Sequence, residues 1–165
     1  MPSWTTMNDL STGDLVTEAD MDAIRGNIEY LLDPNPQRLL RDNGGNYSTT
    51  STAFVDVDGT NLAATITTHG GPVLVLASGV YYGSASIVIS LDIAVDGTRL
   101  GSSFAEGLYR KAVSTGADAF TLAALVTGLS AGAHTFKLQW KVNTGTGYLQ
   151  SAAAQTPVQL TVIEL

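Results

Sequence analysis

The feature that most constrains the fold is an alternation of apolar and small or polar residues with a period of two, which recurs from Ala53 to the C-terminus. Successive side chains of a β-strand point to opposite faces, so this period indicates strands that bury one face. The pattern is clearest in residues 87–95 and 134–142. The side chains predicted to form the core are Ile87, Ile89, Leu91, Ile93, Phe136, Leu138 and Trp140.

Glycine-rich turn signals separate these segments, and no second helix is needed between them. They include Asp58-Gly59, Gly70-Gly71-Pro72, Asp96-Gly97, Gly128 and Gly145. Strands joined by turns, without alternating helices, favour an antiparallel architecture. We therefore predict an all-β fold, an antiparallel jelly-roll sandwich preceded by one short N-terminal helix, with a closed up-and-down barrel as the second choice.

The N-terminal helix is expected over residues 17–32. Thr17 is a good N-cap and Asp20 occupies the N3 position of a capping box, while Pro34 and Pro36 end the helix. The apolar stripe on this helix consists of Met21, Ile24, Ile28 and Leu31. Because so short a helix is marginal alone in water, two interpretations are open: it packs on its own domain, or identical helices form a parallel trimer bundle on a symmetry axis.

The chain is expected to have three parts. Residues 1–33 form an attachment segment with the helix, and residues 34–52, rich in Pro, Gly, Ser and Thr, form a linker. Residues 53–165 form the jelly-roll head. The chain has 165 residues, which is long enough for one such domain with a small appendage.

Composition excludes several classes of partner. The formal net charge is −7 and the eight Lys and Arg residues form no cluster, so neither nucleic acid nor an anionic membrane is expected as a partner. Only 14% of residues are charged, which indicates a surface partly covered by other copies of the chain. No membrane span and no secretion signal are expected, and without cysteine neither disulfides nor thiolate metal sites form.

Three motifs carry candidate chemistry, and each is better explained by a turn or a strand. Gly128-Leu129-Ser130-Ala131-Gly132 matches the nucleophile elbow of esterases as a string, but a strand and not a helix follows Ser130. The two histidines, His69 and His134, lack metal-binding spacing, and the acidic stretch 56–60 lacks the later ligands of a calcium loop. The sequence predicts no enzyme, no cofactor and no metal.

Two stretches resemble known families. The N-terminal residues Trp4-Thr5, 13–17, Met21, Ile24-Arg25, Asn27-Ile28 and Tyr30-Leu31 resemble the leader of bacteriophage tail-fibre-like proteins. Residues 79–101, 120–142 and 158–165 resemble the trimeric jelly-roll heads of the complement globular-head and tumour-necrosis-factor class. In that class the C-terminal strand lies near the threefold axis.

Together the resemblances imply a non-enzymatic phage virion protein at the virion surface, made in the host cytoplasm without a signal peptide. It would be a homotrimer that contacts other virion proteins through its N-terminal segment. Its head would act as a tail-fibre receptor-binding tip for a host surface glycan or protein; the alternative is a capsid decoration protein. A cellular carbohydrate-binding module is a further alternative, although Tyr81, Tyr82, Tyr109 and Tyr148 show no clear shared face.

Overall fold

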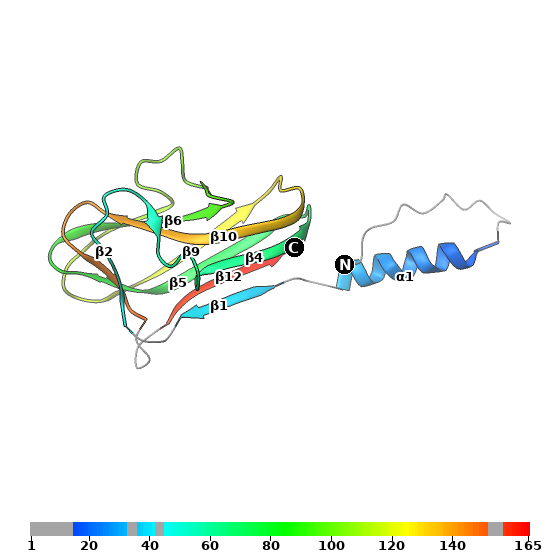
Figure 1. Cartoon of the computed structure of the whole chain (residues 1–165), viewed down its shortest axis with the longest axis horizontal. Coiled ribbons are helices and arrows are strands. Elements are labelled where there is room, and N and C mark those ends of the chain that lie inside the picture. Colours follow the sequence, from blue (N-terminus) through cyan, green and yellow to red (C-terminus); the bar gives the residue numbers. More distant parts are fainter. Residues whose placement is uncertain (1–14, 33–35, 42–44, 152–156) are drawn as a thin grey trace. The chain divides into compact units, whose positions relative to one another are not determined.

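The computed structural model describes residues 15–32, 36–41, 45–151 and 157–165. It divides into two compact units, which we call the helical unit (Met1–Asn35) and the sandwich unit (Pro36–Leu165). The leader motifs within residues 1–14 lie outside the described residues. Among the described residues, the helical unit contains a helix and the regular elements of the sandwich unit are strands (Figure 1).

Helix α1 spans Glu18–Leu32 and begins at the predicted capping box. The amide of Asp20 donates to Oγ1 of Thr17 (3.2 Å), and the amide of Thr17 donates back to Oδ2 of Asp20 (2.9 Å). Two amides that the first helical turn leaves without helical partners are thereby satisfied. The predicted helix and its start are confirmed.

The sandwich unit consists of two antiparallel sheets, so the predicted jelly-roll sandwich is confirmed (Figure 1). In the first sheet the order is β1-β12-β5-β11-β2, with β9 also paired to β5. In the second sheet the order is β3-β10-β6-β7, with β4 paired to β10 and β8 paired to β6. The strands of the first sheet are β1 (Gln37–Arg41), β2 (Tyr47–Thr49), β5 (Val73–Gly83), β9 (Asp118–Val126), β11 (Gly147–Leu149) and β12 (Val158–Glu164). The strands of the second sheet are β3 (Val55–Asp56), β4 (Ala63–His69), β6 (Ile87–Val95), β7 (Thr98–Arg99), β8 (Tyr109–Val113) and β10 (Ala131–Val142).

The hydrophobic core lies between the two sheets. All seven side chains expected in the core are buried, on strands β6 and β10. These strands pair with Leu91 opposite Trp140 and Ile93 opposite Leu138, so the large side chains of neighbouring strands point to the same side. From the first sheet, β5 and β12 contribute buried residues such as Val75 and Leu160.

The structure differs from the sequence-based division in the range expected to be a linker. Strands β1 and β2 lie within residues 34–52 and pair with β12 and β11. In β1, Leu39 lies opposite Leu160 and packs against the core. The sequence pattern predicts a linker here because a five-residue strand with one inward apolar side chain is too short to show a period.

The strand registers define two ends of the sandwich unit. At one end, which we call the tether end, β1 begins at Gln37 opposite Val162 and the chain finishes at Leu165. At the opposite end, which we call the far end, β5 finishes at Gly83, β6 begins at Ile87 and β10 finishes at Val142. The turns of the far end therefore lie farthest from the point where the chain leaves for the helical unit (Figure 1).

Candidate assembly surface

The outer face of strands β5, β9 and β12 carries no charged side chain. This surface, which we call the uncharged face, faces away from the second sheet because its residues alternate with core residues. It consists of Leu74, Leu76, Ser78, Val80, Tyr82, Ala119, Thr121, Ala123, Leu125, Gln159, Thr161 and Ile163.

Apolar side chains of the uncharged face are neighbours across the three strands. Ile163, Leu74 and Leu125 form one row across the sheet, since Leu74 pairs with both others. The next row of the same face places Leu76 opposite Ala123. Directly opposed residues on one face lie close enough for side-chain contact, so these rows form a continuous apolar patch. Leu125 has 59% of its surface exposed.

The outer face of the second sheet has the opposite character. This face carries three ion pairs. The distance from Nζ of Lys137 to Oδ2 of Asp56 is 2.8 Å, and that from Nη1 of Arg99 to Oδ2 of Asp92 is 3.4 Å. The third pair joins Nζ of Lys141 to Oε1 of Glu106 at 3.6 Å. Charged residues in mutual contact are typical of a surface that faces solvent. The outer face of β5, β9 and β12 and that of the second sheet therefore differ in charge, although both belong to one sandwich.

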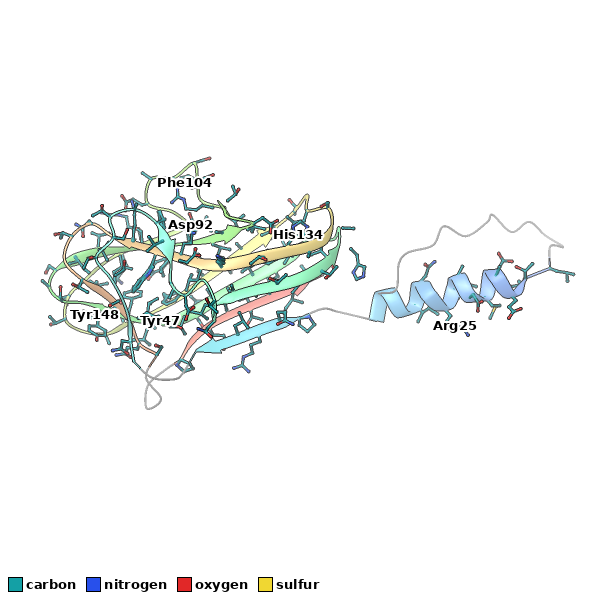
Figure 2. All side chains as sticks on the ribbon, in the orientation of Figure 1. Arg25, Tyr47, Asp92, Phe104, His134 and Tyr148 are labelled. Carbon is teal, nitrogen blue, oxygen red and sulfur yellow. The ribbon has the colours of Figure 1, made fainter. Side chains whose placement is uncertain are left out.

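Asp92 is a buried carboxylate on this second face, and it holds the loop that follows β7. Its Oδ1 accepts hydrogen bonds from the amides of Ile93 and Gly101 at 2.8 and 3.0 Å. Burial raises the pKa of Asp92, while the two amides and Arg99 oppose that rise. Figure 2 shows Asp92 on the sandwich beneath the loop that carries Phe104. Asp92 therefore holds the loop after β7 in place, and this structural role explains its burial.

In the helical unit, the predicted stripe is partly exposed. Met21 and Ile28 have 56% and 49% of their surface exposed. Ile24 is half-buried, and the side chain of Leu31 lies outside the described residues. An exposed pair of large apolar side chains one heptad apart is a second apolar surface on the chain.

Ser130 lies in an exposed turn, and a strand follows it. Its backbone carbonyl accepts a hydrogen bond from Oγ1 of Thr68 (2.9 Å) and from Nε2 of His134 (2.9 Å). His134 also donates through Nδ1 to Asp96 (2.7 Å), and this hydrogen bond, with that to Ser130, raises the pKa of His134. The arrangement connects two turns and uses the backbone of Ser130, which supports the interpretation of this motif as a turn.

The other candidate residues have structural partners. Nδ1 of His69 lies 3.0 Å from Oε2 of Glu164. The other carboxylate oxygen, Oε1, accepts hydrogen bonds from the backbone amides of His69 and Gly71. Asp58 closes a turn: burial would raise its pKa, but hydrogen bonds, chiefly from Asn61, lower it to about 2. In the described residues, no group of three or more His, Cys, Asp or Glu side chains is placed to hold a metal. No helix among those residues is both long and apolar enough to span a membrane.

The four tyrosines considered for a carbohydrate platform occupy two different environments. Tyr81 and Tyr109 share a hydrogen bond between their hydroxyls (2.6 Å), and Tyr81 is buried in the core. Tyr82 and Tyr148 pair on the outer side of the first sheet, with ring centroids 4.7 Å apart and nearly parallel planes. The four rings therefore form no single platform.

The uncharged face was missed at the level of sequence, although β5 carries a signal for it. Residues 73–77 are apolar at both parities, with Val73, Val75 and Ala77 inward and Leu74 and Leu76 outward. A strand that is apolar on both faces is typical of one covered on both sides. Nothing in a single strand indicates that its neighbours lack charge on the same face, because that depends on the pairing.

No family model matches this sequence, and no curated protein matches it significantly. The resemblance to phage leaders accordingly has no support from a matching sequence and stays a prediction. Among solved structures, the chain is similar to murine APRIL, with 14% identity and a TM-score of 0.47 over 81% of this chain and 100% of that chain. The chain is also similar to Eiger TNF from S. frugiperda, with 16% identity and a TM-score of 0.45 over 79% of this chain and 93% of that chain.

A structure of the infectious bursal disease virus Gx strain is also similar, with 11% identity and a TM-score of 0.46 over 79% of this chain. This chain spans only 36% of the length of that viral chain. Similarity at this level concerns the jelly-roll arrangement of strands alone and carries no information on what this chain binds.

Proposed function

We propose that the chain is a non-enzymatic structural protein of a bacteriophage particle, in which three copies associate through the uncharged face. The observation that supports the proposal is the contrast between the outer face of β5, β9 and β12 and the outer face of the second sheet; the charge that borders the uncharged face is Arg38 of β1, opposite Thr161. The twelve outward residues of β5, β9 and β12 that form the uncharged face carry no charge, whereas the outer face of the second sheet carries ion pairs. The chain has 8 Lys and Arg and 15 Asp and Glu residues, and none of them is among these twelve positions.

A cyclic trimer joins two different patches of each chain, because its contacts are head-to-tail. The second patch in this proposal is the unpaired backbone edge of strand β9, which in the described part of the chain pairs with β5 alone. From Ala119 to Val126 this edge contains neither a charge nor a proline, the usual protections of an exposed edge. This edge borders the uncharged face, to which β9 itself contributes, so a neighbouring chain could cover both.

The helical unit would attach the trimer to the particle. Its exposed side chains Met21 and Ile28 are suited either to a three-helix contact or to a groove on another virion protein. The sandwich would then project as a surface knob that binds the host, as a tail-fibre head does. The structural explanations found for Ser130, His69 and His134 support a role without catalysis.

A capsid decoration protein is the second candidate, and one observation favours it. Because β1 belongs to the sandwich, only four residues separate Leu32 at the end of α1 from Gln37 at the start of β1. Four residues span at most about 14 Å when fully extended. So short a connection suits a protein that lies close to the capsid surface.

Two measurements on the full-length protein test the proposal. Light scattering at micromolar concentration is expected to give three times the chain mass of 17.2 kDa. Antibody against the purified protein, imaged by electron microscopy, is expected to label the tail tips or the capsid of the parent particle. A monomeric mass, or particles without label, would refute the proposal, and the labelled position decides between fibre and decoration.

A further inference from the structure

The far end of the sandwich contains a pocket of about 430 Å³. It is formed by segments far apart in the sequence: the turn before β6, the end of β8 and the residue after β10. The residues that matter for its chemistry are Ser86, Ile87, Val88, Ala112, Ser114 and Asn143. It therefore opens at the end opposite to the one where the chain leaves for the helical unit.

Hydrogen bonds between the turns hold this end of the molecule together. The amide of Gly83 donates to the carbonyl of Ser114 (2.8 Å), and the amide of Ser84 donates to the carbonyl of Thr146 (2.9 Å). At the pocket itself, the amide of Val88 donates to Oδ1 of Asn143 (2.6 Å). Three turns linked in this way form a preorganised site, which reduces the entropy lost when a ligand binds.

The lining of the pocket combines neutral hydroxyl and amide groups with aliphatic surface. Ser86 and Ser114 are exposed and offer hydroxyls that both donate and accept. Asn143 uses its oxygen on Val88, which leaves its Nδ2 group to donate to a ligand. Val88 and Ala112 supply aliphatic surface beside these groups, while the side chain of Ile87 is buried in the core.

None of the lining residues is charged. A carboxylate, phosphate or ammonium ligand would lose its hydration without gaining a charged partner, which is unfavourable. A ligand with many hydroxyls and a C–H face meets no such cost, because each hydroxyl can exchange water for Ser86, Ser114 or Asn143. We infer that the pocket binds a neutral saccharide, at the end of the sandwich farthest from the tether.

The inference rests on the proposed function, since it supplies the host ligand of a particle-borne knob. The proposed saccharide site and the uncharged face are separate surfaces. The pocket is lined by the turn before β6, by β6, by the end of β8 and by the residue after β10, which belong to or adjoin the second sheet, whereas the proposed trimer contact lies on the first sheet. Binding and trimerisation can therefore be measured independently.

The experiment applies the full-length protein to an array of immobilised neutral oligosaccharides, with sialylated and sulfated ones as charged probes. We expect binding to one or more neutral oligosaccharides and none to the charged probes. Ser86→Trp places an indole in the pocket and is expected to weaken the binding about tenfold or more. The matched control is Thr144→Trp, at an exposed position of the same end that does not line the pocket, and it is expected to bind as the unmodified protein does.

Three results would overturn the inference. The protein could bind no neutral oligosaccharide, it could bind only the charged probes, or the two tryptophan variants could bind equally well. Light scattering on the same samples separates this outcome from failure of the proposed function. A trimer that binds no neutral oligosaccharide refutes the saccharide site alone, whereas a monomer refutes the proposed assembly.

Discussion

Replacement of Ala123 by aspartate tests the assembly surface most directly. Ala123 is exposed on β9 and lies opposite Leu76 on the uncharged face. In an isolated chain the new carboxylate would remain in water, so the sandwich is expected to fold normally. In a trimer that covers this face, each chain would bury one carboxylate against apolar side chains of its neighbour.

The size of the effect follows from the cost of removing a carboxylate from water. That cost is several kcal/mol for each ion inside a protein, even after the surroundings relax. With about 2 kcal/mol per chain as a low value, three chains lose about 6 kcal/mol of association free energy, which weakens the association constant by about 10⁴-fold. The loss of one methyl group adds little to this figure.

The assay is sedimentation equilibrium over a concentration series, with thermal unfolding followed by circular dichroism to check the fold. Ala133→Asp is the matched control: Ala133 is also an exposed alanine, and it lies on β10, on the outer face of the second sheet. We expect Ala123→Asp to dissociate at concentrations at which Ala133→Asp and the unmodified protein stay trimeric. If both variants stay trimeric, the uncharged face is not the contact and the reasoning fails.

Three further predictions concern single side chains. Changing Ile24 and Ile28 together to aspartate is expected to reduce particle attachment or trimer mass without altering the melting temperature of the sandwich; unfolding of the sandwich by this change would show that the helix belongs to its core. Because the pKa of His134 is raised in the folded state by Asp96 and Ser130, its contribution to stability is complete below pH 6.5, its ordinary pKa, and is lost as the pH rises through the folded-state value. The unfolding free energies of the unmodified protein and His134→Gln, measured in urea, should therefore differ most at low pH and converge as the pH rises, and a constant difference would contradict this. Ser130→Ala should leave folding and binding unchanged, because only the backbone carbonyl of Ser130 is used; loss of binding with the fold intact would reopen a role for its hydroxyl.

Part of the fold could be predicted because the signals that encode it are local. The capping box of Thr17 and Asp20 involves residues three positions apart. The core positions of β6 and β10 follow from the two-residue period of each strand by itself. The strand β1 could not be predicted in this way, since its place depends on pairing with β12, over a hundred residues later.

The candidate surfaces depend on pairing in the same manner. The leucines at 74, 76 and 125 are visible in the sequence, but only the registers of β5 with β9 and β12 place them on one face without a charge between them. The pocket at the far end needs Ser86, Ser114 and Asn143 to meet, and these residues belong to three separate turns. Neither surface has a sequence motif.

The sequence by itself therefore determined the type of each main element and the side of it that is buried, because period and capping act within a few residues. Tertiary structure decided which elements became neighbours, and with that which outward residues lie together. The physical reason is that strand pairing and turn contacts join residues of large sequence separation, whose registers are set by the packing of the whole core. The uncharged face and the neutral pocket exist only at that level.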